Sequence, residues 1–267
     1  MIISHQHKFI FLHVPKTAGS SINTFLSNYL GPNDILNGWN HPLRSGVPYN
    51  KKTLRMVNNR FGLKMISKAI NLRIKDGNIF EKPIIDFALR EVLKKKIGTT
   101  SIHATAKHIK KFDNKAWNEY FKFAFVRNPY THALSHWMFN TTEWSIINDK
   151  FKKKNFTKQE FIKYLKNLKK VIKDKKNYYH DMVPFNKIYT IDGKLAVDFV
   201  GKFENLNNDI EEIKKILNLP GKKIELIHTK KKTNRSHLHL YSKESMRLVE
   251  EIWEKEFELF DYKFPYK

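Results

Sequence analysis

Short, unbroken apolar runs alternate along this chain with segments of helical periodicity. Residues 8–12 and 121–126 each form such a run, which is typical of a parallel strand covered on both faces, and each run leads through a turn into a helical segment. Phe199–Phe203 reads as a third core strand. Strands that alternate with helices indicate βαβ units, so we predict one α/β domain over residues 1–267 with a mostly parallel central sheet flanked by helices.

Turn and capping residues predict the other elements. A helix is expected from Ser20 that stops at Gly31-Pro32, and another from Pro83 that ends before Gly98. Between them lies a basic amphipathic segment over Lys51–Lys75, whose expected buried face is Leu54, Val57, Phe61, Met65 and Ile66. The later elements are a strand over Thr99–Ile102, a helix opened by Thr157, a tight turn at Asp192-Gly193, and helices that start near Asn205 and Ser242.

Charge and composition limit the classes of function. The chain has 50 Lys+Arg and 26 Asp+Glu, a formal net charge of +24, which indicates an anionic partner: nucleic acid, a membrane surface, or a phosphorylated or sulfated small molecule. It has no cysteine, which excludes disulfides, thiol nucleophiles and cysteine-based metal sites. The longest apolar runs are far shorter than the ~20 residues that cross a bilayer, so we expect a soluble intracellular protein.

The first motif is the strand-to-helix turn HVPKTAGSS at residues 13–21. Its glycine permits a sharp turn, and the helix that follows offers unpaired N–H groups at its positive end. Lys16 adds a charge, and Thr17, Ser20 and Ser21 add hydroxyl donors. The turn is not a Walker A loop, because the lysine precedes the glycine. Taken alone, it is either an anion site or an ordinary βα connection.

The second motif, FAFVRNPYTHALSHW, puts the cation Arg127 at the end of another buried strand and Ser135 on the next helix. The ends of parallel strands converge on one edge of an open α/β sheet. Two phosphate-holding elements at this edge suit a ligand that carries phosphates at both ends of a nucleoside.

The pair PKTAGSS and FVRNPYTHALSHW resembles the two nucleotide motifs of sulfotransferases that use 3′-phosphoadenosine-5′-phosphosulfate (PAPS), in particular the carbohydrate branch with chondroitin- and uronosyl-type Golgi enzymes and bacterial relatives. The resemblance implies a P-loop-like three-layer fold. It covers residues 8–30, 99–140 and 178–262. Residues 31–98 and 141–177 have no counterpart, and we interpret them as variable, acceptor-side insertions.

The resemblance also implies roles for individual residues. Lys16 would neutralise charge on the departing nucleotide. Arg127 and Ser135 would hold the 3′-phosphate, and Ser236 in the closing loop would contact the nucleotide. His103 would be the general base, with a core histidine as the alternative role and His108 as the rival base. The donor-binding set is then Pro15, Lys16, Thr17, Ala18, Gly19, Ser20, Ser21, Arg127, Ser135 and Ser236.

We therefore expect a PAPS-dependent sulfotransferase, bacterial and cytoplasmic, that sulfates a hydroxyl of a saccharide or glycolipid-like acceptor and releases 3′-phosphoadenosine-5′-phosphate (PAP). His237 and His239 alternate, but no third ligand is apparent and no metal is expected. Two alternatives stay open at this point: a basic nucleic-acid-binding protein, although no standard recognition motif is present, and a P-loop-like kinase that uses ATP.

Overall fold

The computed structural model describes residues 1–76, 83–98, 102–147, 156–173, 185–221 and 234–265. Its helices are α1 (Gly19–Ser27), α2 (Asn40–Arg44), α3 (Lys51–Val57), α4 (Arg60–Asp76), α5 (Ile84–Ile97), α6 (Ala106–Phe112), α7 (Asn114–Glu119), α8 (Pro129–Ile147), α9 (Lys158–Lys173), α10 (Leu206–Ile216), α11 (Lys243–Ile252) and α12 (Glu254–Phe260). Its strands are β1 (Ile2–Ser4), β2 (Phe9–Leu12), β3 (Ile35–Leu36), β4 (Phe121–Val126), β5 (Thr190–Ile191), β6 (Lys194–Leu195) and β7 (Phe199–Lys202). Short 3-10 helices are η1 (Phe185–Ile188), η2 (Phe203–Asn205) and η3 (Asn234–Leu240).

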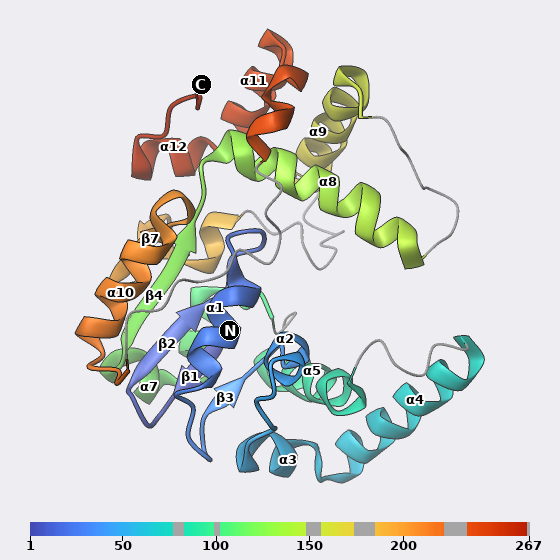
Figure 1. The fold of residues 1–267 in the computed structure, drawn as a ribbon, viewed down its shortest axis with the longest axis vertical. Coiled ribbons are helices and arrows are strands. Elements are labelled where there is room, and N and C mark those ends of the chain that lie inside the picture. The colour runs from blue at the N-terminus through green and yellow to red at the C-terminus, as the bar shows by residue number, and fades with distance from the viewer. Residues whose placement is uncertain (77–82, 99–101, 148–155, 174–184, 222–233, 266–267) are drawn as a thin grey trace.

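Five strands form the central sheet in the order β3-β1-β2-β4-β7. The β2–β4 and β4–β7 pairings are parallel, with Leu12 opposite Ala124 and Val126 opposite Lys202. The short strands β1 and β3 extend one edge in antiparallel pairing. Helices flank this sheet (Figure 1). The predicted α/β fold with a mostly parallel central sheet is confirmed, and its three parallel strands are the three that the apolar runs predicted.

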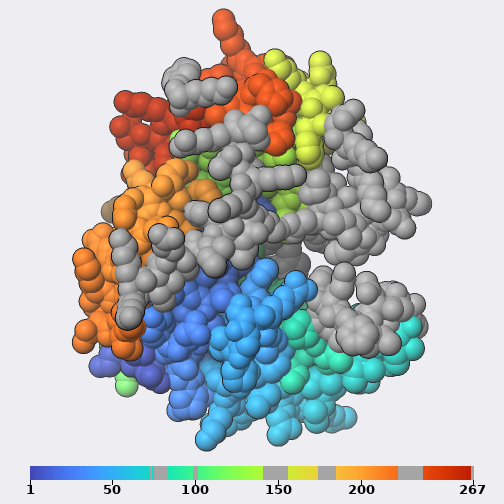
Figure 2. All heavy atoms as spheres, viewed as in Figure 1, coloured from blue at the N-terminus to red at the C-terminus, as the bar shows by residue number. Residues whose placement is uncertain are grey.

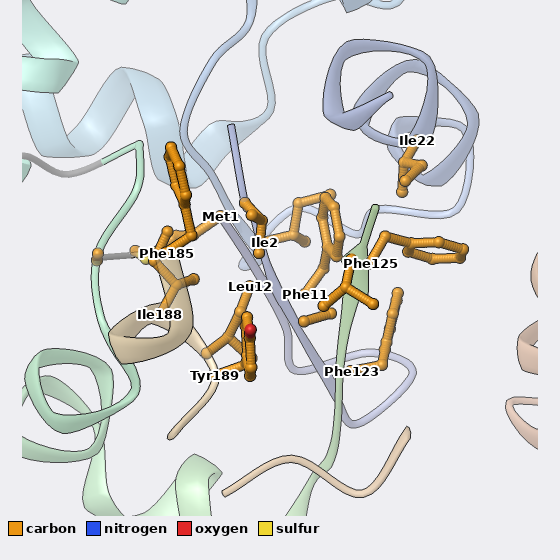
Figure 3. Packing of buried hydrophobic residues seen from close by; sticks show 14 of the residues in the cluster. Met1, Ile2, Phe11, Leu12, Ile22, Phe123, Phe125, Phe185, Ile188 and Tyr189 are labelled. Atoms are coloured by element: carbon orange, nitrogen blue, oxygen red, sulfur yellow. The ribbon is translucent and has the colours of Figure 1, made fainter. Parts of the chain in front are cut away.

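The core fills both faces of β2, because neighbouring side chains of a strand point to opposite faces. Phe11 packs beside Phe123 of β4, with 5.3 Å between ring centroids, on the side where Ile22 of α1 lies (Figure 3). Leu12 points the other way, toward the segment of η1 that carries Ile188 (Figure 3). All five of these side chains are fully buried. A sheet that is covered on both faces explains the unbroken apolar run of β2.

Besides the helices that lie directly against the sheet, Figure 1 shows two further groups of helices. One group surrounds α8, against which α11 packs, and α9 in turn contacts α11. The other group contains α3, α4 and α5, and α4 lies along α5 at the edge of the molecule. The segment after α1 lies beside the segment after α10, because the hydroxyl of Tyr29 donates a hydrogen bond of 3.1 Å to the carbonyl of Pro220. Figure 2 shows N-terminal residues in blue next to α10 in orange on this face.

The basic amphipathic segment predicted over Lys51–Lys75 is two helices, α3 and α4, rather than one continuous face. Asn58 is the C-cap of α3, and the Asn59 side chain accepts hydrogen bonds from the N–H groups of Phe61 and Gly62 at the start of α4. These asparagines satisfy helix ends and so favour a break over a continuous helix. Of the predicted buried face, Val57 and Met65 are buried, but the prediction that Leu54 is buried is wrong, since its side chain is 44% exposed.

The strand predicted over Thr99–Ile102 lies outside the described residues except for Ile102, which is in a turn. The Ile102 carbonyl accepts a hydrogen bond of 3.1 Å from the amino group of Met1. The local signals were otherwise reliable. Confirmed are the Pro83 and Gly98 caps of α5, the Thr157 start of α9, the turn between β5 and β6, and the Asn205 and Ser242 N-cap positions.

Candidate active site

The turn between β2 and α1 has an unusual backbone. Lys16 has φ 61° and Ala18 has φ 64°, both in the left-handed region that residues other than glycine seldom adopt. The buried Thr17 side chain between them donates a hydrogen bond of 2.9 Å to the Val14 carbonyl and so closes the turn. Strain of this kind persists where the surroundings enforce it, and it is common at binding sites. The turn places the start of α1 at the edge of the sheet where β2 ends.

The first N–H groups of α1 precede its internal hydrogen-bond pattern. The bond from Ile22 N–H to the Ala18 carbonyl, 3.1 Å long, opens that pattern, so the N–H groups of residues 19–21 point out of the helix end. Ser20 and Ser21 are half-buried at this end. The helix start therefore offers backbone and hydroxyl donors together with the positive end of the helix dipole, which is an arrangement suited to a phosphate.

Gly19 is required by a neighbour rather than by its own backbone angles. A Cβ at this position would lie 1.8 Å from Nε2 of His13, so the imidazole occupies the space that any other side chain would fill. Burial, followed by the proximity of His103, holds the pKa of His13 well below its ordinary value. The His13 ring is therefore neutral at pH 7, and it packs against Gly19 at the start of α1.

Arg127 follows β4 and is 8% exposed. Its Nη1 donates to the backbone carbonyl of Lys16 at 3.1 Å, its Nε donates to Oγ1 of Thr131 at 3.1 Å, and its guanidinium lies 4.0 Å from the ring centroid of Phe203. Burial lowers the pKa of Arg127 to about 10, against the opposing influence of Glu204, so the group keeps its charge at pH 7. The cation that the sequence placed in the second motif thus contacts the backbone of the first.

One face of α8 joins the two motifs. Thr131 contacts Arg127, and Phe139 holds the ammonium of Lys16 at 3.9 Å from its ring centroid. Ser135 lies four residues from each, so it shares the stripe of the helix between them, and it is half-buried. The structure therefore brings Lys16, Arg127 and Ser135 to one end of the sheet, as the sequence predicted.

His103 lies beside His13, with 4.7 Å between ring centroids. Its Nδ1 is 2.8 Å from the backbone carbonyl of His13. Because a carbonyl only accepts hydrogen bonds, Nδ1 carries the proton, and the neutral ring has its lone pair on Nε2. Since the His13 ring also packs against Gly19, His103 lies one ring away from the start of α1. His108 is held differently: its Nδ1 is 2.5 Å from Oγ1 of Thr105, and burial lowers its pKa.

Two side chains of this region, His132 and Phe139 of α8, escaped the sequence reasoning. His132 of α8 is buried, and burial followed by the charge of Arg127 keeps its pKa well below the ordinary value. The ring of Phe139 holds Lys16. Glu204 accepts a hydrogen bond of 2.9 Å from the Asn128 N–H and so braces the turn after β4. The i, i+3, i+7 spacing of residues 132, 135 and 139 is the pattern that could have revealed this face of α8.

Other candidates lie apart from these contacts. Ser236 falls within η3, but its side chain is outside the described part of the structure. The rings of His237 and His239 are stacked at 6.1 Å. Across the described ranges, no group of three or more His, Asp or Glu side chains is arranged to hold a metal ion. Over those same ranges, no helix is long and apolar enough to cross a membrane.

Comparison with known proteins identifies the class to which this fold and site belong. The profile of the sulfotransferase family matches residues 1–263, which is nearly the whole chain. The chain therefore belongs to the sulfotransferase family, whose activity is the transfer of a sulfuryl group from a nucleotide donor to an acceptor. Neither the curated proteins nor the solved structures contain a match to this chain.

Proposed function

We propose that this sulfotransferase transfers the sulfuryl group of PAPS to a hydroxyl of a saccharide or glycolipid-like acceptor, with His103 as the general base. The observation that carries the proposal is the hydrogen bond from Arg127 to the Lys16 carbonyl, because it unites the two nucleotide motifs in one site. A donor with phosphates on both sides of an adenosine is the ligand that two such cationic elements fit.

The 5′ end of the donor would bind at the start of α1. The N–H groups of residues 17–21 and the Ser20 and Ser21 hydroxyls would receive its phosphate, while Pro15 and Ala18 shape the turn. The Thr17 hydroxyl is engaged with Val14, so the contribution of Thr17 to the phosphate would come from its backbone. Ser135 and Arg127 would hold the 3′-phosphate, with Ser236 as a further contact.

The chemistry is an in-line displacement at sulfur. The acceptor oxygen forms the new bond to sulfur, the bond from sulfur to the bridging oxygen of the donor breaks, and PAP departs. The acceptor proton passes to Nε2 of His103, whose tautomer suits this role because Nδ1 donates to the His13 carbonyl. Lys16 would swing from the Phe139 ring to the bridging oxygen and neutralise the charge that develops there. No covalent enzyme intermediate and no metal are required, so position and charge supply the rate.

The acceptor and the setting rest on the resemblance to the carbohydrate branch. We assign residues 31–98 and 141–177 to the acceptor side, because they lie outside the motifs that the branch shares with this chain. We also place the protein in a bacterial cytoplasm, in keeping with its lack of cysteine. The family match gives no support to a nucleic-acid-binding protein or an ATP-using kinase.

A turnover assay tests the proposal. The protein is incubated with PAPS and a panel of saccharide, glycolipid, phenol and protein acceptors, and both PAP release and sulfated product are measured. Release of PAP that depends on a saccharide acceptor supports the proposal. Turnover with phenols alone would overturn the acceptor class, and phosphoryl transfer from ATP in place of sulfuryl transfer would overturn the reaction itself.

A further inference from the structure

Helix α4 exposes more large apolar side chains than any other element in the described part of the chain. Of the seven exposed large hydrophobic residues found there, four belong to α4. Leu63 is 53% exposed, Ile70 is 41% exposed and Ile74 is 69% exposed, with Leu72 as the fourth. The helix runs along the edge of the molecule, away from the sheet (Figure 1).

Three of these side chains form one stripe. Residues 63, 70 and 74 are spaced seven and four apart, which places them within a narrow arc of a helix. Met65 and Ala69 are buried on a different arc, the one with which α4 packs into the molecule. The apolar sector of α4 is therefore wider than the fold needs, and its outer part faces solvent.

Basic residues border the stripe on its other side. Arg60, Lys64 and Lys68 are exposed and lie on the arc next to the apolar stripe. The surrounding sequence is biased in the same way: residues 35–75 contain nine Lys or Arg and no Asp or Glu. The surface is thus apolar along one line and cationic along the next, and the acidic residue of α4 is Asp76, the last residue of the helix.

We propose that α4 is an interfacial helix that docks this protein on an anionic lipid bilayer. A basic amphipathic helix with aliphatic residues on its apolar face lies in the membrane–water interface, where the apolar stripe enters the acyl boundary and the lysines bind acidic headgroups. At 17 residues α4 is ~26 Å long, enough for several headgroups along one side. A nucleic-acid surface would pair its cations with aromatic stacking residues, and the exposed stripe has none. This inference is independent of the donor site.

Vesicle sedimentation tests the proposal with the full chain. The probes are vesicles of phosphatidylcholine alone and of equal parts phosphatidylcholine and phosphatidylglycerol. The wild type should bind only the anionic vesicles. Changing Leu63, Ile70 and Ile74 together to Ser should weaken that binding by about tenfold or more, and so should Lys64→Glu with Lys68→Glu. All five side chains are exposed, so thermal melting should report folded variants.

Matched controls separate the helix from the charge of the whole protein. Ile216→Ser removes an aliphatic side chain that is 49% exposed on α10, and Lys163→Glu with Lys170→Glu makes the same charge change on α9. Each control should leave the binding within about twofold, because it lies outside the docking helix. Equal losses in controls and α4 variants, or no binding of the wild type to anionic vesicles, would overturn the proposal. Two further outcomes would overturn the proposal. One is that the wild type is a dimer and the variant with Ser at positions 63, 70 and 74 is a monomer. The other is that the wild type binds RNA and only the α4 variants lose that binding.

Discussion

The guanidinium of Arg127 donates a hydrogen bond of 3.1 Å to the backbone carbonyl of Lys16, although 111 residues separate the two along the chain. Lys16 follows the parallel strand β2 and Arg127 follows its neighbour β4. The bond therefore ties together two strand ends, each of which carries a cation. Had the two residues lain on separate faces, no single nucleotide could have reached both.

Lys16→Ala should slow turnover far more than it weakens nucleotide binding. The side chain is proposed to neutralise charge that builds only as the nucleotide departs, so its loss raises the barrier of the chemical step. We expect kcat to fall by about 10²–10³-fold, with a much smaller change in the Kd for PAP. Steady-state kinetics with PAPS and calorimetric titration of PAP measure the two quantities. Lys107→Ala, an exposed change on α6, serves as the control. Equal losses in kcat and PAP affinity would mean that Lys16 acts in binding alone.

His103→Ala should remove the base. We expect kcat to fall by about 10²–10⁴-fold, and added imidazole to restore part of the activity. The wild-type rate should drop at low pH because a protonated imidazole accepts no proton, and the variant should lose this limb of the pH–rate profile. The His13–His103 contacts put the start of α1 within reach of this ring.

His108→Ala is the matched test of the rival base. Its Nδ1 is engaged with Thr105, which also caps α6, so we expect the variant to keep activity within a few-fold of the wild type. If His108→Ala loses the low-pH limb while His103→Ala keeps it, His103 is not the base and the assignment passes to His108.

Glu256 makes the stability of the fold depend on pH. Its side chain lies on α12, is 3% exposed and accepts a hydrogen bond of 3.0 Å from Tyr189, and burial raises its pKa from 4.5 to about 7. The folded state therefore holds this proton where the unfolded state has lost it. As pH rises from 4.5 to 7, the free energy of unfolding should lose about 3 kcal/mol from this group.

Urea unfolding of the wild type and Glu256→Gln at a series of pH values measures this contribution. The amide stays uncharged and can still accept from Tyr189, so the variant should gain stability over the wild type across this pH window. The difference between the two proteins isolates Glu256 from His13 and His132, whose lowered pKa values give the opposite slope. Glu254→Gln, on the exposed side of the same helix, is the control. A difference between wild type and Glu256→Gln that is constant with pH would contradict the account.

Local signals predicted the parts of the fold that local interactions determine. The run of β2 is apolar because both faces of the strand are covered, and caps such as Ser242 act within one turn of their helix. The strand β1 carries no comparable signal, because its three residues are held by pairing with β2 and β3. The break between α3 and α4 depends on two asparagines within an otherwise continuous helical pattern.

The candidate site also has a part that the sequence predicts and a part that it does not. Lys16, Gly19 and Arg127 stand in motifs that are readable along the chain, and their position after parallel strands predicts that they meet. The contact of Phe139 with Lys16 and the carbonyl of His13 that orients His103 depend on packing between distant segments. Such contacts require the three-dimensional arrangement, because nothing in the local sequence specifies which partner each side chain will find.

Calorimetric titration of the wild type and Arg127→Ala with PAP and ADP tests the central claim. Each nucleotide carries two phosphates, so the attraction of a +24 protein for anions acts on both, and only the position of the second phosphate differs. We predict that the wild type binds PAP about 100-fold more tightly than ADP, and that Arg127→Ala, if folded by thermal melting, binds the two alike. Equal affinity of the wild type for PAP and ADP would contradict a site that holds both ends of one adenosine donor.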